Sequence, residues 1–237
     1  MGCKRRGSAP DGQPVTGDGA AALDPAAVAH GPEPSHTTHS GGSPATLQRQ
    51  RGNIRSVDCV RGQLLIAGPG VQDPSFWRTV VLVIEHSARG ALGLVLNRPS
   101  DTLVSEAVPE LVSLADPGDQ ILVGGPVGQS SVIVLADFED PGEAALIAFD
   151  SVGVLAGGGT AALAGVTLRR TRVFAGHSGW GPGQLDGELE RGDWILEPAR
   201  HGDAFAERPS ELWSAVLSRK GGSYALVARM PNDPSQN

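Results

Sequence analysis

Short runs of apolar residues, with the patterns typical of β-strands, recur along much of the chain. Residues 63–67 and 79–84 form short apolar runs, and the second is rich in β-branched side chains, as buried strands are. Residues 91–97 follow a turn at 88–90, which predicts a hairpin with the run before it, and Pro99 is expected to end that strand. Further strands are predicted over residues 120–123, 131–136, 145–149, 171–175, 193–197 and 224–230.

Helical spacing of apolar residues is confined to three stretches. Residues 102–114 carry apolar side chains at spacings of four and three, and Pro109 is expected to divide them into two short helices. A helix is predicted to open after Pro182, and another over residues 211–219, capped by Ser210. Because strands outnumber helices and do not alternate with them, the pattern favours an α+β fold, a sheet with peripheral helices, over a doubly wound parallel sheet.

Composition separates a tail from a folded domain. Residues 1–55 are rich in Gly, Pro, Ala, Ser and Thr and contain no aromatic residue, whereas all four Trp, all five Phe and the single Tyr lie beyond residue 75. A segment with so few apolar residues cannot offset its ordering entropy of about 1–2 kcal/mol per residue. We therefore expect a disordered extension over residues 1–55 and one folded domain over residues 56–237.

Charge narrows the classes of partner. The chain has a formal net charge of −7, and the part beyond residue 55 is more acidic than the tail. Such a surface repels phosphate backbones and anionic lipids, so neither direct nucleic-acid binding nor membrane binding is expected. The two cysteines lack CxxC spacing, and no apolar segment suits a signal peptide or a membrane span. A cytoplasmic location is expected.

No group of residues identifies a reaction. Residues 176–180 follow a predicted strand like the Gly-x-Ser-x-Gly turn of serine hydrolases, but Trp180 stands where the second glycine belongs, and only His201 follows Ser178 as a base. Adjacent side chains of a strand point to opposite faces, so Glu85 and His86 do not form a metal site together.

Two loops have compositions that partly resemble ligand-binding loops. Residues 137–143 are acidic but lack the register of a calcium loop, and residues 157–160 are glycine-rich but have no following Lys to hold a phosphate. A solvated turn and a flexible loop are the simpler interpretations. No catalytic residue, metal or cofactor is predicted.

Three ordered segments carry a family resemblance. They are residues 62–86, with Phe76-Trp77-Arg78; residues 90–99, ending in Asn97-Arg98-Pro99, with Gly124-Gly125-Pro126-Val127 beyond; and residues 176–194, with Gly179-Trp180 and Gln184-Leu185. In order and spacing, over about residues 60–230, the chain resembles the YqgE/AlgH family of mostly uncharacterised bacterial proteins. At His177-Ser178 it departs from the more usual Tyr-Ala, so the resemblance gives these two residues no catalytic role.

The resemblance implies both a fold and a role. The fold would be α+β, with a bifurcated, partly barrel-like sheet surrounded by helices. The role would be in transcriptional control, without established catalytic residues or cofactor, and the acidic domain opposes direct DNA contact. Two hypotheses stay open: a non-enzymatic regulator or interaction module acting through a protein partner or small ligand, and an unrecognised enzyme acting on a small molecule. A deep pocket with convergent polar groups is expected of the enzyme.

Strand ends and one helix start supply the candidate binding residues. They are Glu85, His86, Asn97, Arg98, Trp180 and Gln184, which are predicted to lie near one concave surface that binds a partner or ligand. The hairpin complicates this prediction, because it puts Glu85 near the turn and Asn97 toward the other end, about 20 Å away. In the alternative interpretation, Asn97 and Arg98 cap the strand exit and Trp180 fills the core.

Overall fold

Within the described residues, ten strands pair into one sheet. The computed structural model describes residues 59–71, 73–116, 118–156 and 165–230, so the expectations for residues 1–55 and 157–160 lie outside the described residues. The strands of the described part are β1 (Gln63–Ala67), β2 (Val80–Ser87), β3 (Gly90–Val95), β4 (Pro99–Leu103), β5 (Gln120–Val123), β6 (Val127–Phe138), β7 (Leu146–Phe149), β8 (Val152–Val154), β9 (Leu168–Trp180) and β10 (Trp194–Pro198).

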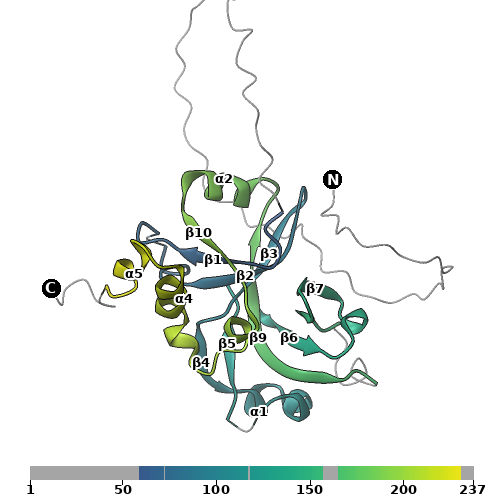
Figure 1. The fold of residues 1–237 in the computed structure, drawn as a ribbon. Helices are drawn as coiled ribbons and strands as arrows, with labels where there is room; N and C mark the ends of the chain where they lie inside the picture. Colours follow the sequence, from purple (N-terminus) through teal and green to yellow (C-terminus); the bar gives the residue numbers. More distant parts are fainter. Residues whose placement is uncertain (1–58, 72, 117, 157–164, 231–237) are drawn as a thin grey trace, which may run out of the picture.

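The long strand β9 joins two parts of the sheet. The main strand order is β10-β1-β2-β3-β9-β6-β8-β7, and β5 branches from β9 with β4 paired to it. The pairs are antiparallel except β5 with β9, which run parallel. In Figure 1, β9 runs down the middle of the molecule between β3 and β6. The α+β class is confirmed, and the strand order is open rather than closed into a barrel.

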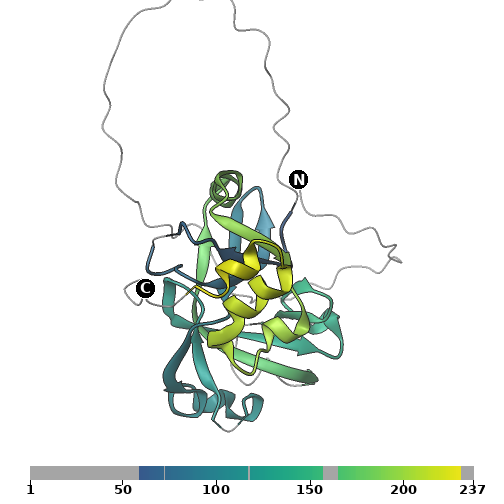
Figure 2. The same ribbon diagram turned by 60° about the vertical axis from the view of Figure 1, so that its left-hand side comes forward.

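Short helices surround the sheet. They are α1 (Val104–Ala107), α2 (Gln184–Arg191), α3 (His201–Ala204), α4 (Leu212–Lys220) and α5 (Tyr224–Val227), with the 3₁₀ turns η1 (Pro109–Leu114), η2 (Pro141–Glu143) and η4 (Pro209–Glu211). Figure 2 shows the C-terminal helices lying across one face of the molecule, in front of the strands. Within the described residues, none of the helices is long and apolar enough to cross a membrane.

Strands β1 and β2 are buried on both faces, which explains their continuous apolar sequences. On one face, Leu64 and Leu82 belong to the core cluster that contains the inner side of α4, including Trp213. On the other face, Leu65 and Val81 pack in a second cluster with two further tryptophans. The two faces of this central hairpin therefore carry separate cores.

Three expectations about the elements were wrong. Residues 224–230 do not form a strand, because Tyr224, Val227 and Ala228 pack on the core at helical spacing and the segment folds back on α4 as α5. Ser210 does not cap the α4 helix, since it lies inside η4, and no side chain caps α4. Pro99 opens β4 rather than ending β3, in the first strand position where its missing N–H is tolerated.

Candidate functional site

The fold separates the six predicted binding residues into two groups. His86 pairs with Ala91 across the β2–β3 hairpin, and Ala91 pairs with Trp180 on β9. Glu85 precedes His86 after a bulge in the same pairing, and Gln184 begins α2 beyond Trp180. Glu85, His86, Trp180 and Gln184 thus share one end of the sheet.

Asn97 and Arg98 lie at the opposite end of β2. The Asn97 side chain is buried, accepts a hydrogen bond from the Val80 N–H and donates one to the Arg78 carbonyl, both at 2.8 Å. Val80 is the first residue of β2, and six residues separate it from His86, about 20 Å of extended chain. The prediction from the hairpin geometry agrees with this arrangement.

The first group uses its polar atoms within the fold. Trp180 is 5% exposed, and its indole N–H donates to Glu188 at 2.8 Å, while the indole of Trp194 donates to the same carboxylate oxygen at 2.7 Å. His86 accepts from the Val60 N–H at 3.3 Å and lies 3.4 Å from Asp186. These contacts favour the interpretation of Trp180 as a core residue that fastens α2 to the sheet.

The second group borders a hollow of about 440 Å³. We call it the Trp–Arg hollow and define it by Trp77, Arg78, Asn97, Arg98, Trp213 and Met230, with Ser210, Glu211, Ser214 and Ala228 completing its lining. Its residues come from the loop before β2, the exit of β3, the start of α4 and the turn after α5. The C-terminal helices, folded over the sheet, therefore form one of its walls.

Arg78 is held in an unusual conformation in this hollow. Its φ is +53°, in the left-handed region, where a residue other than Gly, Asn or Asp is strained by about 1–3 kcal/mol. The guanidinium lies 4.8 Å from the ring centre of Trp77 and 4.6 Å from that of Trp213, and it donates to the Met230 carbonyl at 2.6 Å. Partial burial lowers the pKa of Arg78, which nevertheless stays charged at neutral pH.

Arg98 supplies the second positive charge of the hollow. Its Nη2 donates to the carbonyls of Pro74, at 3.3 Å, and Trp77, at 2.8 Å. Its Nε and Nη1 have no acceptor among the described residues. Trp77 is 37% exposed and Met230 51% exposed, so apolar surface adjoins the two cations. The hollow can hold an anionic group next to an apolar one.

A Ser–His–Asp cluster lies elsewhere, and it bears on the enzyme hypothesis. His201 Nδ1 is 3.5 Å from Asp137 Oδ2, and His201 Nε2 is 3.4 Å from Ser151 Oγ. Ser151 donates its single proton to Asp137 at 2.7 Å, and Arg169 binds the same carboxylate oxygen at 3.1 Å. Because the hydroxyl is closer to the carboxylate than to the imidazole, His201 is not placed as its base, unlike in a catalytic triad.

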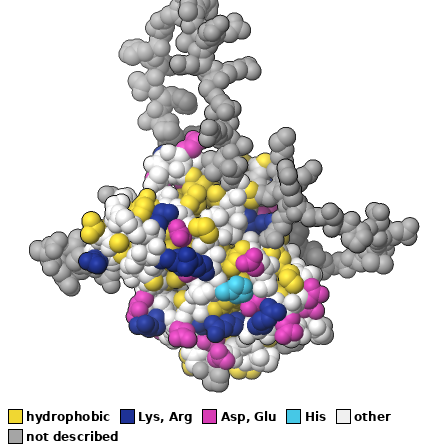
Figure 3. Space-filling view, in the orientation of Figure 1, with side chains coloured by type: hydrophobic (Ala, Val, Ile, Leu, Met, Phe, Trp, Pro, Cys, Tyr) yellow, Lys and Arg dark blue, Asp and Glu magenta, His cyan; other side chains and the backbone are white. Residues whose placement is uncertain are grey.

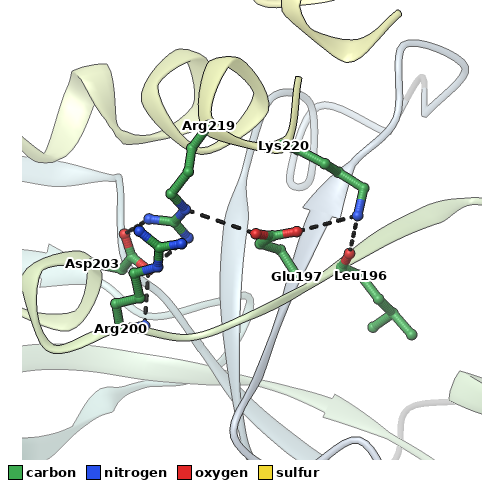
Figure 4. Close-up of polar contacts among 6 residues, drawn as sticks. All are labelled: Leu196, Glu197, Arg200, Asp203, Arg219 and Lys220. Carbon is green, nitrogen blue, oxygen red and sulfur yellow. Dashed lines mark hydrogen bonds and ion pairs between the residues drawn. The ribbon is translucent and has the colours of Figure 1, made fainter. Parts of the chain in front are cut away.

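An ion-pair network fastens the helix that carries His201. Figure 4 shows Arg219 of α4 gripping Asp203 of α3 through two bonds, of 2.6 and 2.9 Å, and approaching Glu197 of β10 at 3.8 Å. Lys220 binds Glu197 at 3.2 Å and the Leu196 carbonyl at 2.8 Å. The Asp203 interaction raises the pKa of Arg219. These charges join α3, α4 and β10 and serve a structural purpose.

The surface in the view of Figure 3 mixes both signs of charge, with Lys and Arg side chains next to Asp and Glu. Arg172 and Arg208 follow this rule, pairing with Asp119 and Glu211 at 2.9 and 2.8 Å. Throughout the part of the chain that is described, no cluster of three or more His, Cys, Asp or Glu side chains suits a metal ion.

Sequence reasoning named Asn97 and Arg98 but missed the four other residues that define the hollow. Trp77 and Arg78 were noted only as part of a family segment, and Trp213 only as part of an apolar helix face. Met230 was assigned to a strand. An Arg between two tryptophans that are far apart in the sequence gives no local pattern. The signal in the sequence for this hollow is the Trp77-Arg78 pair together with the Asn97-Arg98 pair.

Known proteins resemble this chain over most of its length. A family model described as AlgH-like, DUF179, matches residues 64–225. A UPF0301 protein of Thermobifida fusca is 41% identical over 187 residues, covering 74% of this chain and 94% of the relative, and a UPF0301 protein of Streptomyces coelicolor is 36% identical, covering 78% and 98%.

Two solved structures share the fold. A crystal structure of a Corynebacterium diphtheriae protein aligns with a TM-score of 0.65 at 29% identity, covering 72% of this chain and 92% of that one. The solution structure of AlgH from Pseudomonas aeruginosa, also a UPF0301 protein, aligns with a TM-score of 0.55 at 28% identity, covering 75% and 97%.

Proposed function

Since this chain belongs to the AlgH-like family, in which its UPF0301 relatives carry no stated activity, we propose that it is a non-enzymatic interaction module that binds a protein partner at the Trp–Arg hollow. One observation carries the proposal: a hollow of about 440 Å³ combines two guanidinium groups with the exposed surfaces of Trp77 and Met230. Trp, Met and Arg are among the residues enriched at protein interfaces, and Trp and Arg are also enriched at their energetic centres.

The strain at Arg78 supports a binding role. A left-handed Arg persists only where its surroundings hold it there, and such residues cluster at functional sites. Stacking between Trp77 and Trp213 fixes the guanidinium before any partner arrives, so little side-chain entropy is lost on binding. A preorganised cation beside an exposed indole suits recognition better than it suits chemistry, because neither group is a nucleophile or base at neutral pH.

The regulatory role implied by the AlgH-like resemblance would then act through proteins. A net charge of −7 opposes direct contact with DNA, and Arg169 and Arg172 of β9 are already paired with Asp137 and Asp119. A cytoplasmic location is part of the same proposal. Through such a partner, the protein would influence transcription without touching the duplex.

The test is capture of partners from the cells that produce the protein, with matched surface variants. Tagged wild type, Trp77→Ser and Val112→Ser are compared, because Trp77 and Val112 are both exposed apolar side chains and Val112 lies on η1, away from the hollow. We expect wild type and Val112→Ser to retain the same proteins and Trp77→Ser to lose at least one. Identical recovery with all three chains would contradict the proposed site.

A further inference from the structure

We propose that the occupant of the Trp–Arg hollow is an acidic peptide segment of the partner, with a carboxylate at Arg98 and a neighbouring apolar side chain against Trp77 and Met230. The proposal rests on the proposed function and adds the chemistry of the bound segment.

The hollow is a positive site on a negative molecule. Arg78 and Arg98 both line it, and among the described lining residues the one acidic side chain, Glu211, is paired with Arg208 at 2.8 Å. The whole chain carries −7. The cations of the hollow attract a carboxylate to the hollow itself, while the remaining acidic surface repels acidic segments that approach elsewhere. The charge therefore favours selectivity for acidic residues placed at the hollow.

The donors of Arg98 fit one further acceptor. Both of its protein bonds leave from Nη2, to the carbonyls of Pro74 and Trp77, which fix the direction of the guanidinium. The N–H groups on Nε and Nη1 keep no acceptor within the described residues and can donate to a carboxylate. Bonds from a charged guanidinium to a carboxylate are about twice as strong as neutral ones. Arg78 lies against both indole rings and donates to the Met230 carbonyl, so it adds electrostatic attraction for the carboxylate.

Apolar surface beside these donors distinguishes a peptide from other anions. Trp77 and Met230 stay 37% and 51% exposed, and Leu226 of α5, four residues before Met230, is 69% exposed. A free phosphate or a nucleic-acid backbone would leave this surface in water, whereas a peptide with an acidic and an apolar residue would cover both parts. The volume of about 440 Å³ lies at the small end for drug-sized ligands and is sufficient for two side chains.

The experiment selects peptides from a displayed library of random twelve-residue sequences against the full chain. The winning peptide, labelled with fluorescein, and a version with Asn and Gln in place of Asp and Glu are then titrated by anisotropy. We expect enrichment of Asp or Glu next to Trp, Phe or Leu, at least about tenfold weaker binding by the neutral version, and weaker binding at higher salt.

Variants locate the site. Arg98→Gln should weaken the peptide about tenfold, whereas Arg89→Gln, the same change at an 81% exposed side chain on the hairpin turn, should alter affinity less than twofold. Because Arg98 also holds two carbonyls, its variant is checked for an unchanged urea midpoint. Trp77→Ser, which removes an exposed ring, gives a second reading if Arg98→Gln is unstable.

The outcomes separate the two proposals. Three results would overturn the acidic-segment proposal. They are enrichment of peptides without acidic residues, equal binding of the neutral version, and displacement of the labelled peptide by duplex DNA but not by unlabelled peptide. If cell-derived partners are nevertheless lost with Trp77→Ser, the interaction module stands and only its chemistry is wrong. If those partners are retained by Trp77→Ser, the hollow is not the site and both proposals fail.

Discussion

Replacing Asn97 by Ala removes both hydrogen bonds that hold the start of β2. The Val80 N–H and the Arg78 carbonyl each lose a bond of 2.8 Å, and Val80 is fully buried, so water cannot replace the acceptor. Two net bonds of about 1 kcal/mol each, with a penalty of about 1–3 kcal/mol for the orphaned N–H, predict a loss of about 3–5 kcal/mol in the free energy of unfolding. In a domain of this size, the melting temperature should fall by about 6–20 °C.

Urea denaturation followed by tryptophan fluorescence measures this loss as a lower midpoint with an unchanged slope. Asn97→Asp keeps an acceptor for the Val80 N–H but faces the Arg78 carbonyl with a second oxygen, so it should also destabilise. Ser100→Ala, which removes only the local contacts of its hydroxyl with Thr102 inside β4, is the control and should stay within about 0.5 kcal/mol. A loss below about 1 kcal/mol for Asn97→Ala would refute the reasoning and return Asn97 to the candidate binding residues.

Three further predictions concern residues outside the Trp–Arg hollow. Glu188→Ala leaves the two indole N–H groups without their acceptor and should lower the free energy of unfolding in urea by about 2–4 kcal/mol. An unchanged free energy would mean that water satisfies them. Burial lowers the pKa of His177 from 6.5, so the folded state resists protonation and stability should fall as pH drops below about 6.5. The urea midpoint at pH 7.5 and 5.5 should depend less on pH in His177→Gln, and an equal dependence would reject this cause. Gly125→Ala places a Cβ 2.3 Å from the His177 backbone and should cost more than about 3 kcal/mol by thermal unfolding, against less than about 1 kcal/mol for Gly70→Ala, which meets open space.

The strands could be predicted from the sequence because buried strands are rich in apolar residues. β1 and β2 are covered on both faces, so residues 64–67 and 80–84 are continuous apolar runs. Short elements left weaker signals: β8 has three residues with a central glycine, Gly153, and α3 has four, including Gly202. The apolar residues of α5 had helical spacing, but four residues of helix are hard to tell from a strand.

The candidate site was predictable only in part. Hairpin geometry was enough to show that Asn97 and Glu85 lie toward opposite ends, and strand ends drew attention to Arg98. The hollow itself depends on α4 and α5 folding back over the start of β2, which brings Trp213 and Met230 to Trp77. A left-handed backbone at Arg78 cannot be read from an Arg in the sequence, since arginine has no preference for it.

The pairing of β1 with β10 has a consequence for synthesis on the ribosome. Ala67 pairs with Trp194, so about 130 further residues must be synthesised before the strand that covers this edge of β1 is available. At about 5–20 residues per second, that interval lasts roughly 6–26 seconds. During translation, the nascent antiparallel unit of β1, β2 and β3 therefore presents an open, apolar edge. A chaperone that recognises extended chain should bind there. Ribosome-bound chains truncated before residue 194 should bind such a chaperone, and chains extended well past residue 198 should release it.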